Sequence, residues 1–515
     1  MRFTSLAVEL IRARPVLVFW LAALLPALIW LVLPLALYAS PPGEVGQVLA
    51  IGHEYRLGSD LGPPLAFWLA DLAYRLAGMA GVYLLAQVCF VVMLWAMFAL
   101  GRLMVGAQQA VLATLLTVTI TAFSFPGVEF GPAILARPLW ALVLLHFWQA
   151  VGEGRRAAWF ALSFEIGLLL LTTASAAWLV GLMLAFALAT SRGRRALASL
   201  DPLFALFVVA TLLTPHLVWL AREAGGLLPP LPGAADLADN LRRWPRLAGG
   251  LMLTMAGIVL LALFNSGRLA LKGEAATDEA PIILRPPLDP FARRYVFYFT
   301  LAPPLAASLI AAALGQERVI AGAGMLLAPI GLAVVIAAGA VIHLHRQRML
   351  RAIWIGIIAV PALFVVAVSL LQPWTSDTEV KTMLPAAQIG GFFGDSFERR
   401  TGQPLTAVAG DPALAVLVAL AAPSRPHLVL DAAPERSPWL TPEDFTRTGG
   451  IVVWRAADTA GAVPDDIRRR FPMLTPEVPR AFERMVQGRQ PLLRIGWAIV
   501  RPAAAAAFDA TGSTR

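Results

Sequence analysis

A series of eleven long apolar runs constrains the fold of this chain more than any other feature of its sequence. Each run is long enough to cross, as a helix, a hydrocarbon core of about 30 Å. Hydrophobic residues make up 58% of the chain and charged residues only 14%, which lies outside the range of soluble globular domains. The sequence therefore predicts a polytopic α-helical membrane protein. The runs cover residues 15–38, 80–100, 107–125, 134–150, 157–172, 174–190, 202–221, 247–267, 295–314, 319–342 and 350–372.

The basic residues predict how the chain is oriented. If the N-terminus is cytoplasmic, 17 Lys and Arg residues lie in cytoplasmic segments and 8 lie in loops on the other side, as the positive-inside rule requires. The apolar stretch 157–190 is split near Thr172, because a single span there would move the basic segment 191–195 outside. The region after residue 373 then lies outside. These loop positions explain the net charge of +9 without nucleic-acid binding.

The first outside loop, residues 39–79, is the longest one within the membrane region. From Pro64 onward, apolar residues recur at helical spacing, with Asp71 and Arg75 on the other side. This pattern predicts an amphipathic helix that lies in the membrane interface. Cys89 is the only cysteine and falls inside the second span, so no intrachain disulfide is possible. The apolar positions are Leu65, Trp68, Leu69, Leu72, Ala73 and Leu76.

This loop resembles that of the GT-C glycosyltransferases, in particular the bacterial branch related to protein O-mannosyltransferases and lipid A aminoarabinose transferases. In that branch the loop reads Asp-Glu, then a Tyr-rich segment, then His-Pro-Pro-Leu. Here the corresponding residues are Gly43-Glu44, Tyr55 and Gly62-Pro63-Pro64-Leu65. Segments 152–173 and 214–220 resemble the family's basic turn with its fifth span and the end of its seventh span.

The resemblance implies an enzyme of the bacterial cytoplasmic (inner) membrane with a periplasmic C-terminal domain. Such an enzyme moves a sugar from a polyprenyl-phosphate carrier to a lipid, glycan or protein acceptor. Three family positions differ here, since the catalytic Asp aligns with Gly43, an acidic residue with Arg137 and a Lys with Thr173. A non-catalytic protein that binds the carrier lipid or scaffolds glycan assembly is therefore an alternative. A transporter is a further one, favoured only by the intramembrane Glu165.

Glycosyl transfer needs a base for the acceptor's proton and cations for the departing phosphate. We expect Glu44 to be the base, because it neighbours the family's catalytic position, with Asp60 as the second choice. The alternative is a structural role, in which Glu44 caps the local backbone and Asp60 belongs to its turn. Glu54 and Glu129 are further acidic residues in these loops.

Arginines in the outside loops are the expected phosphate ligands, because the guanidinium group binds phosphate oxygens in pairs. Snorkelling toward lipid head groups is the alternative. No metal-ligand spacing or cofactor motif occurs, so no cofactor is expected beyond the lipid-linked sugar substrate, and the metal requirement stays open. The expected ligands are Arg137, Arg242, Arg243, Arg246 and His216.

The two-domain prediction places a transmembrane GT-C-like domain at 1–373 and a soluble α/β domain at 374–515. Strands are expected at 404–410, 427–431, 449–454 and 494–500, and helices at 385–400, 411–422, 464–470 and 479–487. The alternation indicates a partly parallel sheet. Gly410-Asp411 either faces a ligand at the carboxyl end of its strand or caps the following helix.

Overall fold

The computed structural model describes residues 3–59, 61–125, 127–223, 234–265, 282–430, 437–472, 474–486 and 488–502. The chain divides into two compact units. The helical unit contains Met1–Leu33, Leu57–Ala66 and Ala80–Leu363, and the α/β unit contains Pro34–Arg56, Phe67–Met79 and Phe364–Arg515. The α/β unit thus combines two segments of the first long loop with the C-terminal region.

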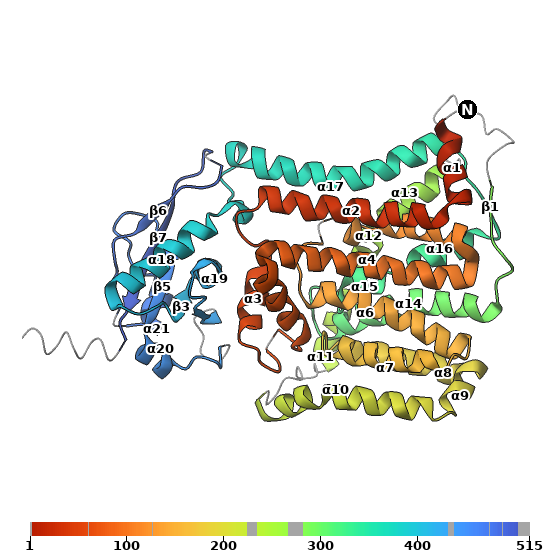
Figure 1. Ribbon diagram of the computed structural model, residues 1–515, viewed down its shortest axis with the longest axis horizontal. Helices are drawn as coiled ribbons and strands as arrows, with labels where there is room; N and C mark the ends of the chain where they lie inside the picture. The colour runs from red at the N-terminus through yellow and green to blue at the C-terminus, as the bar shows by residue number, and fades with distance from the viewer. Residues whose placement is uncertain are drawn as a thin grey trace, which may run out of the picture. The chain divides into compact units, whose positions relative to one another are not determined.

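Helices build the helical unit, and every predicted apolar run coincides with at least one of them. Figure 1 shows α6, α7, α8 and α10 running side by side. A short antiparallel pair joins β1 (Ile282–Leu284) to β2 (Val341–His343). The helices that carry residues of this unit are α1 (Phe3–Ala13), α2 (Pro15–Leu37), α4 (Leu65–Val118), α5 (Thr121–Ser124), α6 (Pro132–Phe147), the π-helical turn η1 (Trp148–Gly152), α7 (Ala157–Leu170), α8 (Ala176–Ala189), α9 (Ser191–Leu197), α10 (Asp201–Glu223), α11 (Ala234–Leu241), α12 (Trp244–Thr254), α13 (Ala256–Asn265), α14 (Pro290–Ala313), α15 (Gly322–Leu326), α16 (Ile330–Ala338) and α17 (Gln347–Thr375).

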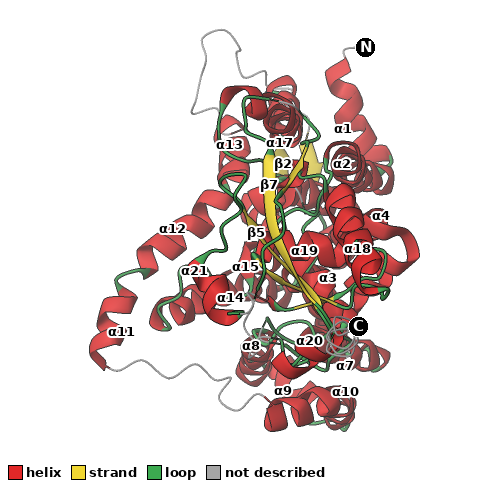
Figure 2. Ribbon diagram, turned by 90° about the vertical axis from the view of Figure 1, so that its left-hand side faces the viewer, coloured by secondary structure: helices red, strands yellow, loops and turns green. Residues whose placement is uncertain are grey.

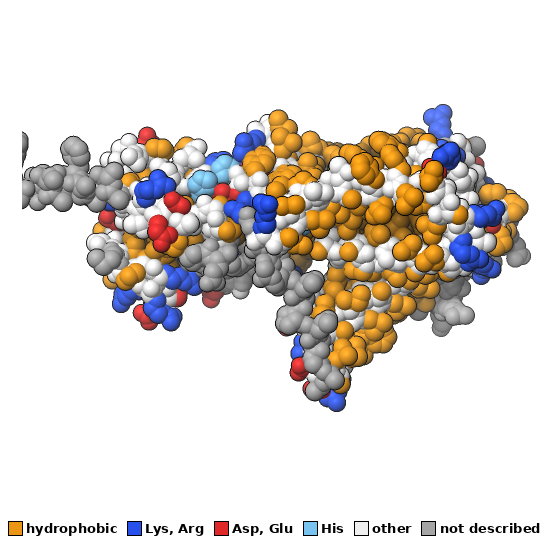
Figure 3. All heavy atoms as spheres, turned by 90° about the horizontal axis from the view of Figure 1, so that it is seen from below, with side chains coloured by type: hydrophobic (Ala, Val, Ile, Leu, Met, Phe, Trp, Pro, Cys, Tyr) orange, Lys and Arg blue, Asp and Glu red, His pale blue; other side chains and the backbone are white. Residues whose placement is uncertain are grey.

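The surface of these helices is that of a multi-pass membrane protein. Within the described residues, six helices are long and apolar enough to span a membrane, or up to eight if two sharply bent pairs each form one span. Large apolar side chains such as Leu203, Phe204 and Phe207 of α10 are exposed. Figure 3 shows hydrophobic side chains over much of one face of this unit, with Lys and Arg gathered at its end. The predicted fold class is confirmed.

The longest helix, α4, has 54 residues and would be about 80 Å long if straight, far more than a bilayer needs. Within this helix, Gly78 has φ +59° and Gly106 has φ +80°. The regular helical backbone is therefore interrupted at these two glycines. Left-handed backbone cannot continue a right-handed helix and strongly favours glycine. The residues before Gly78 correspond to the predicted amphipathic helix, on which Leu72 and Leu76 are exposed and Asp71 is fully buried.

A hydrogen-bonded pair joins two helices of this unit. His146 of α6 lies 2.7 Å from Glu165 of α7, and both side chains are mostly shielded from solvent. Glu165, the intramembrane residue that favoured the transporter alternative, therefore has a local partner.

The C-terminal part of the α/β unit is a five-stranded sheet with the strand order β4-β3-β5-β7-β6. β3 pairs in parallel with β4 and β5, whereas β7 pairs antiparallel with β5 and β6. Figure 2 shows β5 and β7 as neighbouring strands. The elements are α3 (Val45–His53), η2 (Lys381–Met383), α18 (Ala386–Thr401), β3 (Ala407–Gly410), α19 (Pro412–Ala421), β4 (His427–Leu428), α20 (Pro442–Thr448), β5 (Gly450–Arg455), α21 (Asp465–Arg470), β6 (Arg480–Phe482) and β7 (Leu493–Val500).

Helices cover both faces of this sheet. Phe445 of α20 and Ile467 of α21 pack with Val452 and Trp454 of β5 in one buried cluster. Successive strand residues point to opposite faces, and α18 and α19 also contact β5. All four predicted strands are present in this fold.

The predicted helix at 479–487 is wrong, because β6 occupies Arg480–Phe482 and pairs with β7. Phe482 is buried and packs against Phe393 of α18. The local sequence suits a helix, but pairing with the sheet edge decides the conformation, as tertiary contacts commonly override local propensity.

Candidate functional site

In the helical unit, Arg137 faces a small cavity together with two other hydrogen-bond donors. The cavity is lined by Trp30 of α2, Gln87 of α4 and Arg137 of α6, among apolar side chains. Arg137 NH1 donates to the Ala122 carbonyl at 3.1 Å, and its guanidinium carbon lies 5.6 Å from the centre of the Phe123 ring. A Cβ on Gly324 would come within 2.4 Å of Arg137 Nε, so glycine there makes room for the guanidinium group.

Three donors on residues that line this cavity are buried and lack a partner. Within the described residues, Arg137 Nε, Gln87 Nε2 and Trp30 Nε1 have no hydrogen-bond acceptor. A buried donor without an acceptor costs about 1–3 kcal/mol, and more if it is charged. Arg137 also has no carboxylate within ion-pair distance in the described part of the chain. This arrangement suits an anionic group with several acceptor oxygens.

The other predicted phosphate ligands of this unit do not line the cavity. Arg242 pairs with Asp239 at 3.2 Å on the exposed surface, Arg243 NH1 donates to the Gly315 carbonyl at 3.0 Å, and Arg246 is exposed on α12. His216 Nδ1 lies 2.7 Å from the Leu57 carbonyl, and its ring stacks on Trp219. The structure brings Arg137 together with Gln87 and Trp30 instead.

Of the two predicted bases, only Glu44 lies within the described residues. Asp60 lies outside them. Glu44 is exposed at the residue before α3, where its side chain makes no capping hydrogen bond. Gly43 beside it has φ +54°, a left-handed conformation that the family's Asp would adopt less readily than glycine. Because the Glu44 side chain makes no capping hydrogen bond, the structure does not support the capping alternative for this residue.

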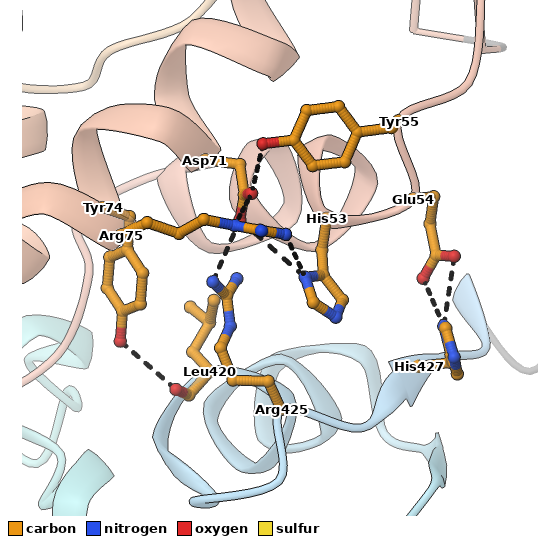
Figure 4. Close-up of polar contacts among 9 residues, drawn as sticks. All are labelled: His53, Glu54, Tyr55, Asp71, Tyr74, Arg75, Leu420, Arg425 and His427. Atoms are coloured by element: carbon orange, nitrogen blue, oxygen red, sulfur yellow. Dashed lines mark hydrogen bonds and ion pairs between the residues drawn. The ribbon is translucent and has the colours of Figure 1, made fainter.

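The α/β unit contains a polar network centred on Asp71, which Figure 4 shows. Asp71 Oδ2 accepts hydrogen bonds from the Tyr55 hydroxyl at 2.9 Å and from Arg75 Nε at 2.6 Å. Asp71 Oδ1 accepts one from Arg425 NH1 at 2.9 Å. The Asp71 side chain is 0% exposed. Two arginines and a tyrosine thus satisfy a fully buried carboxylate, which ties the first loop to residue 425.

Backbone strain marks two partners of Asp71. Tyr55 has φ +48° and Arg425 has φ +47°, a region that residues with a Cβ rarely adopt. Burial and the hydrogen bond to Asp71 raise the pKa of Tyr55 above its ordinary value. Such conformations persist only where surrounding contacts enforce them, and they cluster at functional or switching sites.

A carboxylate–histidine pair lies beside this network. His427 Nδ1 of β4 lies 2.8 Å from Glu54 Oε1, and Glu54 is 6% exposed whereas His427 is 47% exposed. The hydrogen bond to Glu54 raises the pKa of His427, while burial lowers the pKa of nearby His53. A buried carboxylate that orients a more exposed imidazole is a common arrangement for proton transfer.

Sequence reasoning missed most of this network. It placed Asp71 on the polar side of an amphipathic helix, but the partners in the C-terminal region are about 350 residues away along the chain. One local signal exists, since Gly52 lies beside Asp71, whose Cβ would be 3.2 Å from a Cβ placed on that glycine. A Cβ on Gly52 would lie 2.2 Å from the Phe67 carbonyl oxygen, so α3 and α4 approach closely at that point.

Comparisons with known proteins agree with this architecture. Residues 62–219, less than half of the chain, match the family model described as dolichyl-phosphate-mannose-protein mannosyltransferase. This range includes Gln87 and Arg137. The comparison with curated proteins finds no match.

A solved structure shares the fold over nearly the whole chain. The crystal structure of ArnT from Cupriavidus metallidurans bound to undecaprenyl phosphate superimposes with a TM-score of 0.57 at 12% sequence identity, covering 95% of this chain and 98% of that one. Both matches agree with the predicted resemblance, in fold over nearly the whole chain and in sequence over residues 62–219. Among the described residues, no group of three or more His, Cys, Asp or Glu is placed to hold a metal ion.

Proposed function

We propose that the protein is a membrane glycosyltransferase that uses a sugar carried on a polyprenyl phosphate. It transfers the sugar to a hydroxyl of a lipid, glycan or protein acceptor at the periplasmic face of the inner membrane. The fold and the match to the mannosyltransferase family model support this class of reaction. The observation that carries the proposal for this chain is the cavity at Arg137.

The phosphate of the carrier is the ligand that this cavity suits best. A buried cation is normally paired, because removing a charge from water without a partner is costly. Phosphate oxygens would accept from Arg137 Nε, Gln87 Nε2 and Trp30 Nε1. The cavity volume of about 10 Å³ equals about one water molecule, so a single phosphate oxygen would enter it. The neighbouring side chains would have to move to admit more.

The reaction is a one-step displacement with inversion at the anomeric carbon. The acceptor oxygen forms a bond to this carbon while the bond from the carbon to the phosphate oxygen breaks, and the electron pair leaves on the phosphate. Donors aimed at the phosphate stabilise that developing charge. The acceptor's proton passes to a base. Glu44 remains our first candidate because it is exposed and uncapped. Asp60, the second candidate from the sequence, lies outside the described residues, and His427, oriented by Glu54, is a third.

Gly43 favours a rival function, which is binding of the carrier lipid without sugar transfer. Glycine stands here where the resembling family has its catalytic Asp, and a chain that needs this Asp for transfer would only bind the carrier. Both functions need the phosphate site, but only transfer needs a base.

Transfer in vitro distinguishes the two. The full chain in lipid nanodiscs is incubated with defined polyprenyl-phosphate sugars and candidate acceptors, alongside Glu44→Gln, Asp60→Asn and His427→Gln variants. Loss of a properly placed base lowers the rate about 10²–10⁴-fold, so one of these variants should lose transfer to that extent. Glu443→Gln, on the exposed surface of α20, is the matched control and should transfer normally. Carrier binding without transfer from any donor would establish the non-catalytic function instead.

A further inference from the structure

The α/β unit contains a crevice at the position where open α/β sheets commonly bind ligands. The chain leaves β3 through α19 toward β4 on one side, and it leaves β5 through α21 toward β6 on the other. Connections that diverge from two adjacent parallel strands open a crevice outside the carboxyl ends of those strands. A crevice of about 320 Å³ lies here, within the range of roughly 300–1,000 Å³ for ligand pockets.

The residues that line the crevice come from both diverging connections. Gly410 and Asp411 end β3 and begin α19, and Arg455 ends β5. Asp466 and Arg470 lie one turn apart on α21. The lining is therefore polar and carries two carboxylates and two guanidinium groups.

Close packing of the two strands shapes the floor of the crevice. Gly410 has φ +115°, and a Cβ there would lie 1.9 Å from the Val453 carbonyl oxygen. Asp411 N–H donates to the same carbonyl at 2.7 Å. Asp411 Oδ1 accepts from the backbone N–H groups of Ala413 and Leu414. The capping interpretation of Asp411 is thus confirmed, and the cap holds this side chain at the rim.

One further feature indicates a ligand site rather than an ordinary loop junction. Arg455 is fixed by Glu379, whose carboxylate lies 2.5 Å away. A guanidinium group held in one orientation favours a polar ligand with acceptor atoms. Trp454 also lines the crevice, but its buried indole N–H lies against Gly496 of β7.

We propose that this crevice is a saccharide-binding site, distinct from the phosphate cavity at Arg137. Its two carboxylates only accept hydrogen bonds and its two guanidinium groups only donate. Sugar hydroxyl groups do both, so a neutral saccharide satisfies such an alternating set. The charges of the four side chains cancel, which makes the crevice a poor site for a free phosphate. The proposal requires binding only, and it holds whether or not the chain transfers a sugar.

The test compares two pairs of substitutions on the same helix. Asp466→Asn with Arg470→Gln changes the crevice, whereas Asp465→Asn with Arg469→Gln makes the same chemical changes at exposed neighbours that do not line it. The full chain in nanodiscs is titrated with glucose, galactose and N-acetylglucosamine, and binding is followed by saturation-transfer NMR of the sugar. Inorganic phosphate is titrated in parallel.

We expect at least one of these sugars to bind. The double substitution Asp466→Asn/Arg470→Gln, the crevice pair, should reduce the affinity roughly tenfold or more. The double substitution Asp465→Asn/Arg469→Gln, the neighbouring pair, should leave it unchanged. Three results would overturn the proposal. They are the absence of sugar binding that depends on Asp466 and Arg470, equal losses in both pairs, and phosphate binding that depends on the crevice pair. Transfer is measured separately, so a chain that transfers sugar but shows no such binding refutes this site alone.

Discussion

At the scale of single residues, Asp71 is the centre of the polar network in the α/β unit (Figure 4). Its side chain is fully buried and accepts hydrogen bonds from Tyr55, Arg75 and Arg425. A buried carboxylate in a low-dielectric environment is stable only with such compensation. Arg425 also lies 4.7 Å from the centre of the Tyr74 ring, so one arginine connects two residues of the first loop to the C-terminal region.

Asp71→Asn should destabilise the α/β unit. The substitution removes the negative charge and leaves two guanidinium groups facing each other, which costs about 3 kcal/mol for a largely buried pair. Thermal unfolding of the full chain in detergent measures the effect. Asp444→Asn, which breaks the exposed pair with Arg447, is the control and should change the melting temperature little. Equal stability of the Asp71 variant and wild type would show that the network does not hold the unit together.

His427 should titrate above its ordinary pKa of about 6.5, because the hydrogen bond to Glu54 favours the protonated ring. The folded-state pKa is raised, so the contribution of this pair to stability is full below about pH 6.5 and is lost as the pH rises through the folded-state value. NMR titration of labelled histidine in wild type and Glu54→Gln measures the shift. We expect the variant's pKa to fall toward the ordinary value, and an unchanged pKa would show that the pair does not form.

At the scale of elements, the close approach of neighbouring backbone segments determines how the strands of the α/β unit pack. At Gly410 the carboxyl ends of β3 and β5 meet at a distance that excludes a side chain. Gly391 of α18 is the opposite case, since nothing lies within 4 Å of the position of a Cβ there.

Gly410→Ala should therefore destabilise the protein strongly, because the new methyl group clashes with the Val453 carbonyl and the left-handed backbone disfavours alanine. Gly391→Ala should instead stabilise it by about 0.5–1 kcal/mol, the usual gain inside a helix. Melting temperatures of both variants, compared with that of the wild type, test the two predictions. A Gly410→Ala chain as stable as Gly391→Ala would contradict the strand geometry.

Hydrophobicity and local patterns predict the elements of this chain well, because each apolar run and each buried strand is encoded within 5 to 25 or so consecutive residues. Contacts between distant segments cannot be read in this way. The Asp71 network depends on Arg425, and the strand β6 depends on pairing with β7. Arg137 was predicted from its unusual place at the end of a span, whereas its neighbours Trp30 and Gln87 carry no local signal that separates them from ordinary span residues.

At the scale of the whole molecule, the orientation in the membrane remains a prediction from the charge distribution. Arg194 lies in a loop expected to be cytoplasmic, and Arg399 lies in the C-terminal domain expected to be periplasmic. Both side chains are exposed, and the native Cys89 is buried. A membrane-impermeant maleimide applied to spheroplasts should label Arg399→Cys directly and Arg194→Cys only after permeabilisation. The reverse pattern would invert the topology.

The central claim is that Arg137 binds the phosphate of a polyprenyl carrier. Undecaprenyl phosphate binding to the full chain in nanodiscs, followed by ³¹P NMR of the carrier, tests this claim most directly. We predict that Arg137→Gln weakens binding about tenfold or more, as expected for the loss of a charge-assisted hydrogen bond, while the exposed Arg242→Gln binds as wild type does. Wild-type affinity in the Arg137→Gln variant would contradict the account.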